Sequence, residues 1–75
     1  MPLVQVKVIE GVFDHAQKQA IVTGVTDAMV AVSGENLRPV TWVVVDEVAS
    51  GHWGIGGTPL STDYVLSLVS GVPTR

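Results

Sequence analysis

Cysteine is absent from this chain of 75 residues, and charged and aromatic side chains are scarce. Without cysteine the chain has no disulfide and no thiolate-ligated zinc site, which fits a reducing compartment. The net charge is −3, and lysine and arginine together number four. An acidic chain with so few cations has no basic patch for a phosphate backbone, so we expect no nucleic-acid partner.

Long apolar runs are absent as well. No stretch of the chain reaches the roughly 18 consecutive apolar residues that are needed to span a bilayer. The start Met1-Pro2-Leu3 lacks the positive charge that opens a secretory signal peptide. We therefore expect a cytoplasmic protein without a membrane partner.

Apolar residues are abundant, at 47% of the chain against 15% charged residues. We expect residues 1–75 to form a single domain, and a domain of this size buries only about 60–65% of the surface that its unfolded chain exposes. Because no disulfide compensates for so small a core, association with further copies is the remaining source of stability. The composition therefore predicts a homo-oligomer.

Two segments of the chain read as β-strands. Residues 3–9 alternate in character, with valine at every second position from Val4 to Val8. Pro39 marks the start of a second extended run over residues 40–48, which is rich in β-branched side chains. A helical pattern separates the two strands. The order predicts an α+β fold built on a β-α-β unit, in which the two strands run parallel.

The helix between the strands has recognisable ends. Asp14 and Gln17 have the spacing of a capping box, which places its start. An apolar stripe covers residues 21–32 at helical spacing, and Gly34 is placed to end the helix. Gly24 lies mid-helix, where glycine costs about 1 kcal/mol relative to alanine. We therefore expect the helix to pack closely on the sheet at Gly24.

The C-terminal third of the chain reads as a turn followed by a helix. The stretch HWGIGG, residues 52–57, suits a tight turn or a short hairpin. A short helix is expected over residues 62–69, starting near Ser61. The tail from Gly71 to Arg75 is expected to fray.

The motifs of cofactor and metal sites are missing. The glycines of the turn match no phosphate-binding pattern, and a turn that needs positive φ angles explains them more simply. His15 and His52 have no partner at the spacing of a metal site. Asp46 and Glu47 are adjacent in a strand and point to opposite faces, so they cannot serve one substrate as an acid–base pair. We expect neither a cofactor nor a metal ion.

Pro2 allows two interpretations. Proline has no amide hydrogen to donate, and at the first position of a strand it is often merely tolerated. Removal of Met1, however, would leave Pro2 with a secondary amine, whose ordinary pKa near 8 burial can lower toward neutrality. Such an amine is suited to act as a general base. The dipeptide Met-Pro alone favours the tolerated proline.

Five features taken together resemble the 4-oxalocrotonate tautomerase family over about residues 2–57. They are Pro2, the strand end Ile9-Glu10-Gly11, the helix start with Asp14, Gln17 and Lys18, the valine-rich second strand, and GHWGIGG at Gly51 to Gly57. The resemblance implies a β-α-β protomer and dimers that pair their sheets into four strands. It further implies a hexamer, built as a trimer of dimers, with a dimer as the simpler alternative.

The resemblance also implies a chemistry. The nitrogen of Pro2 would take a proton from a carbon beside a carbonyl group and return it elsewhere, which isomerises a keto–enol or double-bond system. The substrate would be a small-molecule carbonyl compound, and no cofactor is needed. Trp53 occupies the position of an aromatic residue that lines the family's pocket and lowers its polarity.

Two departures from the family pattern narrow the expected substrate. Better-known members carry arginines at the positions held here by Val12 and Trp42. An arginine–carboxylate contact is among the stronger polar interactions, so its loss argues against a dicarboxylate substrate. Arg38, a few residues before Trp42, is a candidate replacement that binds substrate, and an exposed loop position is equally compatible with its place beside Pro39.

Three functions follow as hypotheses. The first is a tautomerase with Pro2 as general base and an apolar pocket walled by Val12, Trp42 and Trp53. The second is a catalytically silent subunit, or the partner subunit of a tautomerase-like oligomer whose other chain brings the arginines. The third is a module that binds hydrophobic small molecules without turnover.

Overall fold

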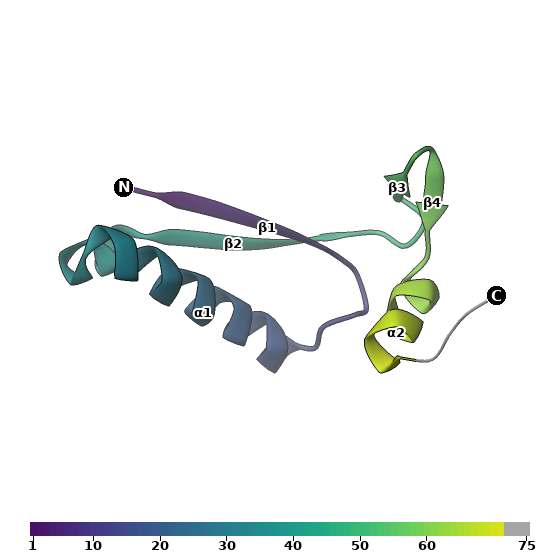
Figure 1. Ribbon diagram of the computed structural model, residues 1–75, viewed down its shortest axis with the longest axis horizontal. Coiled ribbons are helices and arrows are strands. Elements are labelled where there is room, and N and C mark those ends of the chain that lie inside the picture. The colour runs from purple at the N-terminus through teal and green to yellow at the C-terminus, as the bar shows by residue number, and fades with distance from the viewer. Residues whose placement is uncertain (72–75) are drawn as a thin grey trace. The chain divides into compact units, whose positions relative to one another are not determined.

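The computed structural model describes residues 1–71, and these form an α+β fold (Figure 1). The predicted β-α-β unit with a short hairpin and a short C-terminal helix is confirmed. In chain order the elements are β1 (Leu3–Ile9), α1 (His15–Ser33), the 3₁₀ helix η1 (Glu35–Val40), β2 (Trp42–Val48), β3 (Trp53–Ile55), β4 (Thr58–Leu60) and α2 (Thr62–Ser70).

The chain divides into two compact units. The helical unit comprises Met1–Val6 and Phe13–Asp46, and the turn unit comprises Lys7–Val12 and Glu47–Arg75. The interpretation of residues 1–75 as a single domain stays a prediction.

β1 and β2 are neighbours in one sheet. In the helical unit the amide of Trp42 donates to the carbonyl of Pro2 over 2.9 Å. In the turn unit the amide of Glu10 donates to the carbonyl of Val48 over 2.8 Å. Both strands advance in the same direction between these two bonds, so they run parallel, as predicted.

α1 begins and ends where the sequence indicated. The amide of Gln17 donates to the Asp14 carboxylate over 2.7 Å, and the amide of Asp14 donates to the Gln17 side chain over 2.9 Å. These reciprocal bonds form the predicted capping box. At the other end Gly34 donates its amide to the carbonyl of Val30 over 2.8 Å.

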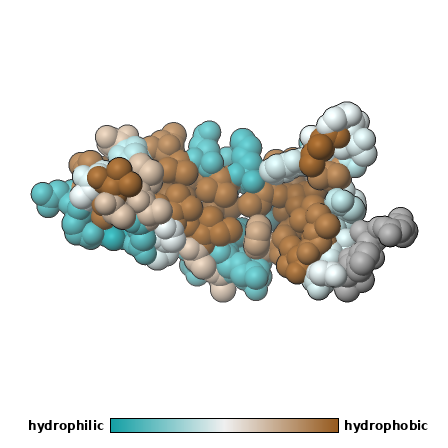
Figure 2. Space-filling model, in the orientation of Figure 1, coloured by the Kyte–Doolittle hydropathy of each residue, from teal (hydrophilic) through white to brown (hydrophobic). Residues whose placement is uncertain are grey.

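Little of the chain is fully buried. Along β1 the side chains alternate between exposed and half-buried, with the valines from Val4 to Val8 on the half-buried face. Among the described residues, the buried hydrophobic side chains are Ile9 and Val30 alone, each 5% exposed. Apolar surface is visible on both units (Figure 2). The chain therefore keeps much apolar area in contact with solvent.

The second strand starts later than predicted. We expected an extended run from residue 40, whereas β2 begins at Trp42 and Pro39 lies inside η1. The 3₁₀ turns are closed by the amide of Leu37, which donates to Gly34, and the amide of Thr41, which donates to Arg38. Proline fits this segment because its fixed φ angle is close to that of a 3₁₀ helix.

The expectation of close packing at Gly24 is wrong. A Cβ atom added at Gly24 would meet nothing within 4 Å, apart from the helix's own backbone and the adjacent residues, and the residue is exposed. Nothing in the structure explains a glycine at this helix position.

The glycine-rich stretch forms the short hairpin that was one of its two expected structures. β3 and β4 pair antiparallel, with Trp53 opposite Leu60 and Ile55 opposite Thr58. The two turn residues, Gly56 and Gly57, have φ angles of +58° and +83°. Two consecutive positive φ angles are what a tight two-residue hairpin turn requires and what glycine adopts without strain.

α2 confirms the predicted C-terminal helix and is one residue longer at its C-terminal end. The hydroxyl oxygen of Ser61 caps it by accepting from the amide of Tyr64 over 3.1 Å. Gly71 ends it in the left-handed conformation. The rest of the tail expected to fray, residues 72–75, lies outside the described residues.

Candidate active site

Pro2 and Trp42 lie together at the beginning of the parallel strands. Pro2 is half-buried and directly precedes β1, and its carbonyl accepts the amide hydrogen of Trp42. The side chain of Trp42 remains 55% exposed. A backbone hydrogen bond thus joins two residues that are 40 positions apart in the sequence. Pro2 is the candidate base, and Trp42 stands where better-known members of the resembled family carry arginine.

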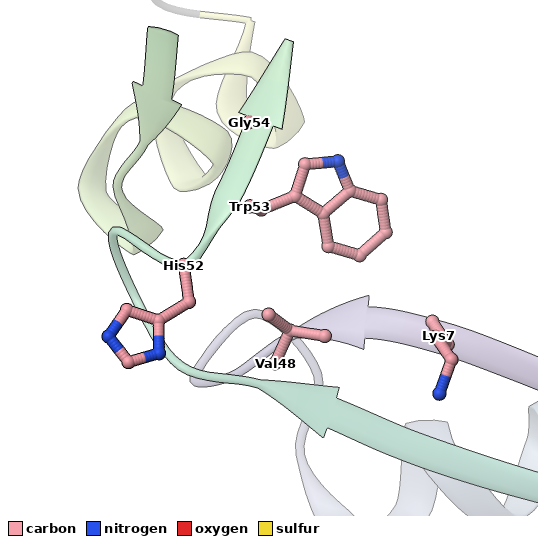
Figure 3. Close-up of a pocket in the computed structure, with 5 residues that line it drawn as sticks. All are labelled: Lys7, Val48, His52, Trp53 and Gly54. Carbon is pink, nitrogen blue, oxygen red and sulfur yellow. The ribbon is translucent and has the colours of Figure 1, made fainter. Parts of the chain in front are cut away.

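Trp53 lines an open cavity of about 270 Å³ in the turn unit. In Figure 3 its indole ring extends from β3 on the side of Val48 and Lys7, whereas the imidazole of His52 points away from the indole. Gly54 completes the lining, and without a side chain it leaves room beside the ring. The indole, the Val48 methyl groups and the alkyl stem of Lys7 make this cavity apolar, with polar groups at its margin.

Arg38 is engaged by two carboxylates of the helical unit. Its Nη1 lies 2.8 Å from Asp27 Oδ1, and its Nε lies 2.6 Å from Glu35 Oε1. The hydrogen bond from Arg38 holds the pKa of the Glu35 carboxyl below its ordinary value, and the bonds to Glu35 and Asp27 raise the pKa of Arg38. All three side chains are exposed, so the cluster contributes little to stability.

Val12 follows directly after Gly11 at the end of the first strand and is half-buried. It does not belong to the lining of the cavity that contains Trp53. Four lining residues were not singled out as site residues from the sequence: Lys7, Val48, His52 and Gly54. The alternating pattern of residues 3–9 could have pointed to Lys7, because it places Lys7 on the strand face opposite the valines.

The described part of the chain offers no obvious place for a metal ion. Residues 1–71 contain no cluster of three or more histidine, cysteine, aspartate or glutamate side chains suited to hold one. Within the same range, no helix has the length and apolar character to cross a membrane.

Comparison with known proteins agrees with this fold. The family model described as "Tautomerase enzyme" matches residues 2–63. A probable tautomerase of Ralstonia nicotianae is 43% identical over 61 residues, which cover 81% of this chain and 84% of that protein. A probable tautomerase of Dickeya dadantii is 37% identical over 57 residues, 76% of this chain and 84% of that protein.

Solved structures give the same result. A structure from work on the 4-oxalocrotonate tautomerase isozymes of Methylibium petroleiphilum matches with a TM-score of 0.70 and 34% identity, covering 77% of this chain and 90% of that chain. The structure of DmpI from Helicobacter pylori matches with a TM-score of 0.70 and 34% identity. The match covers 79% of this chain and 95% of that chain.

The fold and the match together define a class of small β-α-β enzymes that catalyse isomerisation. The chain belongs to the tautomerase family, and the resemblance noted in the sequence is confirmed.

Proposed function

We propose that the protein isomerises a small carbonyl compound, by keto–enol or double-bond tautomerisation, with the nitrogen of Pro2 as general base. The observation that carries this proposal is the family match itself, which begins at residue 2, where the proline stands. The proposal requires the removal of Met1, because an amide nitrogen is not basic. Met1 is 80% exposed, so its bond to Pro2 lies where a processing enzyme can reach it.

The proton balance of the reaction is simple. The neutral secondary amine of Pro2 accepts a proton from the carbon next to the carbonyl and becomes a cation, while the substrate becomes an enolate or dienolate. The same cation returns the proton to another carbon or to oxygen. No oxidant, metal ion or cofactor takes part in the proposed cycle.

We propose an apolar or aromatic carbonyl compound as substrate. Val12 and Trp42 bring no charge, and Trp53 presents a flat ring over an apolar cavity. At Val12 and Trp42 a dicarboxylate would lose hydration without gaining the arginines that better-known members carry there, which is costly. Each of the three side chains is proposed to contact the substrate.

Arg38 is proposed as the residue that assists the substrate's carbonyl oxygen. Its hydrogen bonds to Asp27 and Glu35 use three of the five donor hydrogens of a guanidinium, which leaves two for a substrate. Because two carboxylates already neutralise it, its effect should be modest. We expect Arg38→Gln to lower kcat by less than about tenfold, well short of the 10²–10³ that loss of a main electrostatic stabiliser causes.

A second function is supported by the same uncharged positions. A chain with Val12 and Trp42 in place of arginines would also serve as a silent or partner subunit of a tautomerase-like oligomer. Native mass spectrometry of the assembly purified from its own host distinguishes the two. One chain mass supports the homo-oligomeric enzyme, and a second chain mass supports the partner subunit.

The exposed apolar surface supports the proposal of a homo-oligomer, either a hexamer or a dimer. On one face of the helical unit's strands, Leu3, Trp42 and Val44 are 57%, 55% and 39% exposed. Exposed apolar side chains grouped on two neighbouring strands are typical of a surface that another protein covers. We propose that further copies of this chain cover it.

The proposed function is tested by Pro2→Ala in protein from which Met1 has been removed. We expect the ketonisation of phenylenolpyruvate to slow, but by less than the roughly 10²–10⁴ that full loss of a general base causes, because the N-terminal alanine keeps a primary amine. The assembly mass and the melting temperature, measured on the same sample, serve as controls for folding. Unchanged turnover would show that the proline ring is not needed, and equal activity of protein that retains Met1 would remove the nitrogen of residue 2 from the mechanism.

A further inference from the structure

Three residues of the turn unit form a hydrogen-bonded junction, which we call the Thr62 junction: Glu10, Ser50 and Thr62. The hydroxyl of Thr62 donates to the carbonyl of Glu10 over 2.6 Å, and the amide of Thr62 donates to the Ser50 hydroxyl oxygen over 2.9 Å. The amide of Ser50 donates to the Glu10 carboxylate over 3.2 Å. The three residues are therefore linked in a closed ring of contacts.

The junction also has no spare room. Gly11, directly after Glu10, has a φ angle of +82°, and a Cβ atom added there would lie 3.0 Å from the methyl carbon of Thr62. That distance is shorter than ordinary van der Waals contact. Thr62 is thus held by its hydroxyl on one side and by its methyl group against the backbone on the other.

The junction brackets the hairpin that carries Trp53. Ser50 precedes β3 by three residues, and Thr62 follows β4 by two. Between them the amide of Gly51 donates to the carbonyl of Leu60 over 2.8 Å, and Leu60 is the register partner of Trp53. Both ends of the hairpin are therefore tied to the end of β1 through Glu10.

We propose that Thr62 is a positioning residue, which holds the indole of Trp53 over the cavity through the Thr62 junction. This rests on the proposed function insofar as Trp53 is taken to contact the substrate. The hydroxyl acts by fixing the exit of the hairpin to the carbonyl of Glu10. Without the Thr62 hydroxyl, the carbonyl of Glu10 hydrogen-bonds to water instead. The hairpin then gains freedom, and the indole of Trp53 no longer holds one position beside Val48.

The test replaces Thr62 and observes each tryptophan separately. Biosynthetic incorporation of fluorotryptophan gives one fluorine NMR resonance for Trp42 and one for Trp53, which Trp42→Phe assigns. Thr62→Val removes the hydroxyl and keeps the shape of the side chain, and Thr62→Ser keeps the hydroxyl. Thr26→Val is the matched control, because Thr26 also donates its hydroxyl to a backbone carbonyl, that of Val22 within α1, over 2.7 Å.

We expect Thr62→Val to shift or broaden the Trp53 resonance and to leave the Trp42 resonance in place. Acetophenone, an aromatic carbonyl compound, serves as the binding probe, and the Trp53 resonance follows its titration. Its affinity for Thr62→Val should fall by no more than about tenfold, the range expected for one lost hydrogen bond. Thr62→Ser should restore both, and Thr26→Val should change neither. In turnover, the KM for phenylenolpyruvate should rise more than kcat falls, because the ring is a wall of the pocket and not the base.

The proposal is overturned if Thr62→Val leaves the Trp53 resonance unchanged, or if Thr26→Val perturbs it equally. Should Thr62→Val fail to fold, Ser50→Ala supplies the same test, since it removes the acceptor of the Thr62 amide and should perturb Trp53 alone. Failure of the Pro2 mechanism is recognised separately. Protein that retains Met1 would then be as active as Met1-free protein, while the response of Trp53 to the Thr62 variants persists.

Discussion

At the scale of single residues, the backbone pairing of Pro2 with Trp42 joins the candidate base to a residue that is proposed to contact the substrate. The backbone bond between them sets an uncharged indole at the start of β2. An arginine there would offer two parallel hydrogen bonds to a carboxylate, whereas the indole favours an apolar group. One substitution at position 42 therefore tests what the exchange of arginine for tryptophan does to substrate preference.

We expect Trp42→Arg to raise kcat/KM for phenylenolpyruvate, which carries a carboxylate, by about tenfold, the value of one charge-assisted hydrogen bond. Steady-state kinetics on Met1-free protein measures this. Gln19→Arg is the control, because it adds the same charge at an exposed position of α1, outside the apolar face proposed as the contact between copies. Equal effects of the two variants would show that the added charge acts through the general field and not at the site.

At the scale of elements, α1 has defined ends and an unexplained interior glycine. Nothing in the helix surroundings would meet a methyl group at Gly24. Alanine there reduces the freedom of the unfolded chain and fits the helix without strain. The position should therefore be improvable.

We expect Gly24→Ala to raise the free energy of unfolding by about 1 kcal/mol. Chemical denaturation at one fixed protein concentration measures it. Gly11→Ala should change stability in the opposite direction, because its φ angle is positive and its Cβ atom would press on Thr62. A destabilising Gly24→Ala would mean that the helix is covered at that point in the folded protein.

How much could be read from the sequence depended on the range of the interaction. The capping box at Asp14 and the cap at Ser61 are local, and both are present as predicted. The 3₁₀ helix around Pro39 was missed, because proline also favours extended structure and the ion pairs of Arg38 that accompany the turn are not visible in a pattern.

The site shows the same division. A motif suggested Pro2 and Trp53 as candidates, whereas Lys7 and Val48 were not singled out, because only the folded chain brings these two to the cavity beside Trp53. The Thr62 junction joins residues 10, 50 and 62 by single hydrogen bonds. Contacts of that kind leave no periodic signal in a sequence.

At the scale of the whole molecule, the small amount of buried surface is the main feature. With Ile9 and Val30 as the buried hydrophobic residues among those described, a lone chain has little to offset its conformational entropy. Stability should therefore come from association, and the melting temperature should rise with protein concentration.

We expect Leu3→Asp to break the assembly into smaller species, because the charge would be buried where copies meet. Sedimentation velocity across a range of concentrations measures the change. Gln19→Asp, at an exposed position of α1, adds the same charge and should leave the assembly intact. An unchanged assembly in Leu3→Asp would place the contact between copies elsewhere on the chain.

The central claim is that the free amine of Pro2 performs the chemistry, and Met1 offers the most direct control. Protein that retains Met1 has the same side chains but an amide in place of the amine. Intact-mass measurement gives the fraction of chains without Met1, and ketonisation of phenylenolpyruvate gives the activity of the same samples. We predict activity in proportion to the Met1-free fraction, and equal activity of the Met1-retaining chain would contradict the account.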